Sequence, residues 1–89
     1  MSSLPYSYAG LVPVPVIASF DDLGHIRPLY IRIDLEARKI KTAWLKQSYV
    51  GHSVYECQVI VGNYLKPLTL TYYHDNGLWM IPEQMLSSY

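Results

Sequence analysis

Several features that would identify a function are scarce or missing in this 89-residue chain. Cys57 is the only cysteine, which excludes an internal disulfide and a cysteine-based zinc motif. Seven basic residues balance seven acidic ones, so the chain lacks the overall positive field that gives non-specific nucleic-acid affinity. It contains no Gly-rich phosphate loop, no G-x-S-x-G elbow and no H-E-x-x-H pair. The sequence therefore predicts neither an enzyme nor a cofactor.

A long apolar run is also missing. The run "LVPVPVIASF" at 11–20 is too short and too interrupted by proline to span a bilayer. The opening "MSSLPYSYAG" lacks the positive and apolar regions of a signal peptide. Because a single unpaired cysteine also suits a reducing compartment, we expect a cytoplasmic protein without a membrane partner.

What is present favours one folded domain. Apolar residues make up 51% of the chain and charged residues 16%, a balance typical of globular proteins. Residues 1–10 are Ser, Tyr, Pro and Gly without periodicity and predict a flexible tail. Residues 11–82 carry the strand patterns, and 83–89 follow Pro82 as a tail or a short helical turn.

Alternation of apolar and polar residues predicts about six short strands. The alternating runs lie at 12–20, 29–34, 39–50, 54–62, 68–74 and 78–81. The run 39–50 also fits a short helical face, and its β-branched and aromatic content favours a strand. Pro13 and Pro15 cannot donate to a ladder, which places the first strand at a sheet edge. Short strands without a long helix predict an all-β fold, a small antiparallel barrel or roll of the SH3-like or OB-like kind.

Turn residues separate these runs. "DDLGH" at 21–25 predicts a hairpin, and "LEARK" at 35–39 and "GNYLKP" at 62–67 predict further turns. "HDNG" at 74–77 resembles a catalytic or metal-binding cluster in composition. Because Asn and Gly accept the positive φ of primed hairpin turns, we interpret it as a turn.

The basic residues are unevenly placed. Six of the seven lie between positions 27 and 46, with only Asp34 and Glu36 against them. Aromatic residues interleave with these cations, as in small barrels that stack bases and track phosphates. Tyr30, Arg32, Trp44 and Lys46 are therefore candidate binding residues for a single-stranded nucleic acid. A solvated charged face is the alternative interpretation.

Nine tyrosines are the second anomaly. Tyrosine has an apolar body and a polar tip, which suits protein interfaces and equally suits the half-buried faces of a small β domain. Tyr73, on the half-exposed face of the 68–74 strand, joins the candidate binding residues. Any open strand edge would also offer unpaired backbone groups to a partner or a second copy.

Potential nucleophiles and metal ligands have simpler interpretations. Cys57 lies on the apolar face of the 54–62 strand, which predicts a buried thiol with a raised pKa. His25, His52 and His74 all lie in predicted turns, tens of residues apart, where solvent-facing histidines are more common than zinc ligands.

One resemblance spans most of the chain. "VPVIASFDDLGHIRPLYIRID", "YECQVIVG", "LTLTYY" and "GLWMI" resemble, in order and pattern, small uncharacterised bacterial all-β proteins. The resemblance covers Val12 to Ile81 and implies a small barrel without a known activity, so no catalytic residue is carried over. This chain is longer at both ends than that pattern.

The leading hypothesis is a non-enzymatic protein-interaction or accessory module in the cytoplasm. Self-association, for example as a homodimer, is included in it. The alternative is a small barrel that binds single-stranded nucleic acid through residues 27–46.

Overall fold

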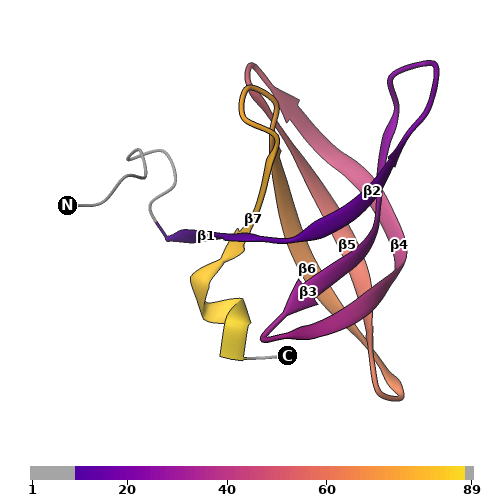
Figure 1. The fold of residues 1–89 in the computed structure, drawn as a ribbon, viewed down its shortest axis with the longest axis vertical. Coiled ribbons are helices and arrows are strands. Elements are labelled where there is room, and N and C mark those ends of the chain that lie inside the picture. The colour runs from indigo at the N-terminus through magenta and orange to yellow at the C-terminus, as the bar shows by residue number, and fades with distance from the viewer. Residues whose placement is uncertain (1–9, 88–89) are drawn as a thin grey trace.

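The structure, a computed structural model, describes residues 10–87 and is almost entirely β (Figure 1). The elements are β1 (Leu11–Val14), β2 (Val16–Phe20), β3 (Ile26–Ile33), β4 (Glu36–Tyr49), β5 (His52–Val61), β6 (Tyr64–Tyr73), β7 (Leu78–Pro82) and the 3-10 turn η2 (Glu83–Ser87). The predicted all-β small barrel with a short C-terminal helical turn is confirmed. The predicted tail at 1–10 lies outside the described residues except for Gly10, whose carbonyl accepts a hydrogen bond from the Glu83 N–H at 2.9 Å.

The seven strands form one antiparallel sheet in the order β1-β7-β6-β5-β4-β3-β2. β1 and β2 are the two halves of the predicted first strand, separated only by Pro15. The first half pairs with β7 and the second with β3, so this segment joins the two ends of the curled sheet (Figure 1). The Pro15 carbonyl accepts a hydrogen bond from the Arg32 N–H at 3.0 Å. Proline has no N–H for a ladder, which suits the point where the strand changes partners.

The core fills the inner face of this sheet. Its buried residues are Ile31, Ile33, Ile40, Tyr55, Cys57, Val59, Leu68, Leu70, Trp79 and Ile81. Burying one such aliphatic or aromatic side chain contributes about 1.5–3 kcal/mol. Met85 of η2 packs against the core, and in Figure 1 η2 lies at the lower end of the barrel. The turns 21–25, 50–51 and 74–77 lie at the opposite end, which we call the mouth.

Two predicted turns are shorter than the sequence suggested. Instead of 35–39 and 62–67, the chain reverses at residues 34–35 and 62–63, and strands resume at Glu36 and Tyr64. Asp34 and Leu35 both have positive φ, 55° and 68°, as a two-residue primed hairpin turn requires. Because Leu35 is an unusual residue for that conformation, no residue pattern indicated so tight a turn.

Alternation over 29–34 predicts that Leu29 faces the core together with Ile31 and Ile33, and for Leu29 this is wrong in part. Ile17 lies opposite Tyr30 and Ala18 opposite Pro28, so Leu29 is the extra residue of a β-bulge. A bulge shifts the side-chain alternation by one residue. Pro28 is therefore buried, while Leu29 is only half-buried.

Replacing Leu35 by glycine is expected to stabilise the domain. The side chain is 91% exposed, so little packing is lost. Removing the strain of the left-handed backbone raises the free energy of unfolding by about 1–2 kcal/mol. The greater freedom of glycine in the unfolded chain lowers it by roughly 0.5–1 kcal/mol. Thermal unfolding of Leu35→Gly should show a midpoint a few degrees higher. Leu65→Gly, in strand β6, is the matched control and should lower the midpoint; a lower midpoint for Leu35→Gly would contradict the turn geometry.

In the part of the chain that the structure describes, no helix has the length and apolar character needed to cross a bilayer.

Candidate functional site

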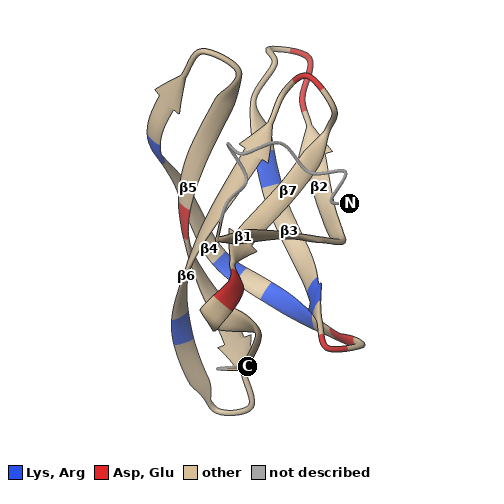
Figure 2. Ribbon diagram, turned by 90° about the vertical axis from the view of Figure 1, so that its left-hand side faces the viewer, with Lys and Arg blue, Asp and Glu red and all other residues tan. Residues whose placement is uncertain are grey.

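The five predicted binding residues lie in three separate places. Tyr30 and Arg32 are exposed on the outer face of β3, Trp44 and Lys46 lie on β4 towards the mouth, and Tyr73 ends β6. The basic residues are separated too: in Figure 2 the lysine and arginine positions are spread over both sides of the view. The basic residues of segment 27–46 do not form one contiguous face.

Lys46 is engaged with a carboxylate on the neighbouring strand. It is the extra residue of a bulge in β4, between the pairs Leu45–Tyr55 and Gln47–Val54. Its Nζ lies 3.2 Å from Glu56 Oε2, which also accepts a hydrogen bond from Thr69 Oγ1 at 3.1 Å. Trp44 lies directly opposite Glu56 in the ladder. A carboxylate therefore lies beside both Trp44 and Lys46, where a phosphate would be repelled.

Tyr30 and Arg32 belong to a shallow hollow that we call the outer groove, of about 250 Å³. Its lining includes Pro15, Val16, Ile17, Tyr30, Arg32 and Ala37. Ile17 lies opposite Tyr30, and their side chains are 64% and 41% exposed. On the other side of Tyr30 its cross-strand partner is Lys39, and Arg32 lies opposite Ala37. The groove thus combines exposed apolar surface with one cation in its lining, Arg32, and a second cation, Lys39, opposite Tyr30.

Tyr73 belongs to an aromatic stack. His52, predicted to lie in a turn, instead begins β5 and is half-buried. Its ring lies between those of Tyr49 and Tyr73, with centroid distances of 4.6 Å and 5.2 Å. These three residues are cross-strand neighbours on β4, β5 and β6, close to the mouth. Because Tyr73 is half-buried in this stack, its contacts here are those of sheet packing.

A larger cavity of about 480 Å³, the mouth cavity, opens at the mouth. Its walls include Ile26, Pro28, Ala43, Leu45, Tyr55 and Tyr72. Ser48, Ser53 and His74 add polar groups to it. Ser53 Oγ lies 2.8 Å from His74 Nε2 and 3.5 Å from Ser48 Oγ. Neither serine is among the predicted site residues. Ser53 has the inward parity of Tyr55 and Cys57, which was an available signal, whereas Ser48 shares that face only because of the bulge at Lys46.

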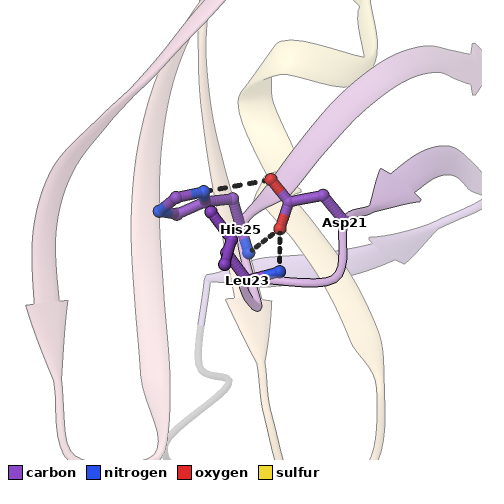
Figure 3. Close-up of polar contacts among 3 residues, drawn as sticks. All are labelled: Asp21, Leu23 and His25. Atoms are coloured by element: carbon purple, nitrogen blue, oxygen red, sulfur yellow. Dashed lines mark hydrogen bonds and ion pairs between the residues drawn. The ribbon is translucent and has the colours of Figure 1, made fainter.

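His25, also at this cavity, is held by Asp21 (Figure 3). The Asp21 Oδ1 atom accepts hydrogen bonds from the N–H groups of His25 at 2.7 Å and Leu23 at 2.9 Å. Asp21 Oδ2 lies 3.0 Å from His25 Nδ1. The His25 N–H above all, together with the other donors, holds the pKa of the Asp21 carboxyl below its ordinary value. Asp21 therefore fixes both the 21–25 turn and the direction of the His25 ring.

Cys57 is buried in the core, and burial together with the charge of Glu56 raises its pKa to about 12. Its thiolate population at neutral pH is on the order of a thousandfold below that of a thiol with the ordinary pKa of 9.0. We therefore expect the folded protein to resist iodoacetamide and the urea-unfolded protein to be labelled readily, as measured by mass spectrometry. Rapid labelling of the folded protein would reopen a role for Cys57 as a nucleophile.

Among residues 10–87, no group of three or more His, Cys, Asp or Glu side chains is placed to hold a metal ion. Comparison with known proteins found no match: no protein-family model, no curated protein and no solved structure matches this chain. The fold and the side chains at the outer groove and the mouth cavity are therefore what bears on function.

Proposed function

We propose that this domain is a non-enzymatic binding module of the cytoplasm, and that it binds a protein partner through the outer groove. The observation that carries the proposal is the exposed pair Ile17 and Tyr30 beside Arg32. We include in this proposal that the barrel is SH3-like or OB-like, because both kinds of small barrel bind ligands on exposed strand faces or in aromatic grooves.

The size of the outer groove suits side chains of a protein rather than a whole small molecule. Its volume of about 250 Å³ lies below the roughly 300–1,000 Å³ of typical small-molecule sites. Tyrosine and arginine are enriched among the residues that dominate binding energy at protein interfaces. One or two apolar side chains of a partner would cover Ile17 and Tyr30 and remove them from water.

The charges beside the groove define the partner further. Lys39 lies next to Tyr30, and Arg32 lines the groove, so a partner segment with acidic and apolar side chains would complement it. Two copies facing each other through this groove would bring Arg32 and Lys39 of both copies together. Repulsion between these like charges disfavours a homodimer through this groove, so we propose a different protein as the partner.

Binding of single-stranded nucleic acid is the second candidate. The observation that favours it is the position of Tyr30 between Arg32 and Lys39 on one outer face, where a base could stack and phosphates could pair. Glu56, opposite Trp44 and paired with Lys46, argues against extending that face along β4.

Selection from a library of random dodecapeptides displayed on phage tests the proposal. We expect enrichment of sequences with acidic and apolar residues, and loss of their binding to a Tyr30→Ala variant. Titration of oligothymidylate into the protein at low salt tests the alternative, binding of single-stranded nucleic acid. Salt-sensitive oligonucleotide binding without peptide enrichment would replace the protein partner by nucleic acid, and enrichment that Tyr30→Ala leaves intact would remove the outer groove as the site.

A further inference from the structure

We propose that the mouth cavity is a second binding site, and that it takes a small uncharged aromatic molecule with one hydrogen-bond donor, such as the hydroxyl of a phenol. This site lies apart from the outer groove and does not depend on the protein partner. Its volume of about 480 Å³ falls within the roughly 300–1,000 Å³ of small-molecule sites, and the mouths of β-barrels are among their usual places.

The cavity follows from how the sheet closes. The N-terminal segment leaves β7 at Pro15 and pairs with β3 from Val16 onward, so β2 has no ladder with β7 towards the mouth. At the opposite end, η2 packs Met85 against the core. At the mouth, the edge-to-face contact between Phe20 and Tyr72, with centroids 6.3 Å apart, links β2 to β6. The barrel interior is thus capped at one end and accessible at the other.

The side chains of the inner face change character at the mouth. Along β5 the inward residues are Val59, Cys57 and Tyr55, all buried and in the core, and the next inward residue is Ser53. Ser53 is buried too, and its hydroxyl is hydrogen-bonded to His74. A hydroxyl at a position that an aliphatic side chain would fill costs stability unless it is paired. Small polar side chains therefore leave space here and place polar groups beside it.

The lining specifies an uncharged aromatic body. The lining residues in the described part of the chain include no Asp, Glu, Lys or Arg. A charged ligand would therefore lose hydration without a counter-charge on the walls. Tyr55 and Tyr72 contribute aromatic rings, which pack against another ring in offset or edge-to-face geometry.

His25 specifies the hydrogen bond. Because the carboxyl of Asp21 has a lowered pKa, it is ionised at neutral pH and can only accept, so Nδ1 of His25 carries the proton of that bond. In the neutral ring Nε2 is then an acceptor, and Figure 3 shows it on the side of the ring away from Asp21. His25 stands at the exposed rim, where it can accept from a ligand hydroxyl while the aromatic body lies deeper.

An NMR titration of the isotopically labelled protein with three probes tests this site. The probes are 2-naphthol, naphthalene without the hydroxyl, and 2-naphthoate with a charge instead. We expect saturable binding of 2-naphthol, with the largest amide shifts at residues 24–26, 43–45 and 53–55. Naphthalene should bind about tenfold more weakly because it lacks one hydrogen bond, and naphthoate more weakly still.

Two variants distinguish the cavity from non-specific apolar binding. Leu45→Trp, at a half-exposed wall position, should block 2-naphthol, whereas Leu65→Trp at the far end of the barrel should not. His25→Ala should abolish the preference for 2-naphthol over naphthalene while both still bind. A dispersed spectrum and an unchanged thermal midpoint show that each variant is folded. Absence of 2-naphthol binding, equal binding of all three probes, or undiminished binding to Leu45→Trp would each overturn the proposal.

Discussion

Replacing Trp79 by alanine is expected to lower the free energy of unfolding by about 3–5 kcal/mol, the range for large buried aromatic residues. Trp79 is buried on the inner face of β7. Its ring centroid lies 4.6 Å from that of Tyr72 and 5.8 Å from that of Tyr55. Because small domains have only about 5–15 kcal/mol in total, this single change removes a large share of the stability. Urea titration followed by circular dichroism would measure it, with a thermal midpoint lowered by at least about 12 °C.

Trp44→Ala is the matched control, because Trp44 is the other tryptophan and is 54% exposed on the outer surface of β4. We expect that variant to lose less than about 1 kcal/mol, as exposed positions usually do. Trp79→Phe should lie between the two. Equal losses for Trp79→Ala and Trp44→Ala would contradict the placement of the core on the inner face of β7.

Replacing Tyr30 by alanine is expected to weaken binding of a groove-selected peptide by about 30-fold, because truncating a central interface tyrosine costs about 2 kcal/mol. The domain itself should lose little stability, since the Tyr30 ring faces outward and is 41% exposed. Isothermal titration calorimetry with the selected peptide gives the affinity, and thermal unfolding checks the fold.

Two further variants give this prediction its controls. Tyr64 is 71% exposed at the β5–β6 hairpin, away from the outer groove, so Tyr64→Ala should leave the affinity unchanged. Arg32→Ala should weaken binding and reduce its dependence on salt, since a cation that pairs with an acidic peptide is lost. If Tyr64→Ala weakened the peptide as much as Tyr30→Ala, binding would reflect general stickiness of exposed tyrosines.

Much of the fold could be predicted because the sheet is half-buried and its residues alternate. On β5 the period of two was read correctly, and Tyr55, Cys57 and Val59 are buried as expected. The errors come from local backbone events. A bulge at Leu29 and a turn with positive φ at Leu35 leave no residue pattern that distinguishes them from ordinary strand and loop.

The sites could be predicted less well, because they depend on which strands meet. Tyr30 and Arg32 were selected for their charge and aromatic character, and the structure places them together. Their neighbour Ile17 comes from β2 and is linked to them only by strand register. The mouth cavity likewise combines His25, Ser53 and Tyr72 from two strands and a turn, which spacing along the chain does not reveal.

The most direct test of the outer groove as a protein-binding surface is an amide chemical-shift map of the labelled domain with a groove-selected peptide. Binding should move the amides of Val16, Ile17, 30–32 and Ala37 as one contiguous patch, and leave those of the β5–β6 hairpin at 61–65 unmoved. Shifts confined to the mouth or to that hairpin would contradict the proposal, because the peptide would then be bound elsewhere on the domain.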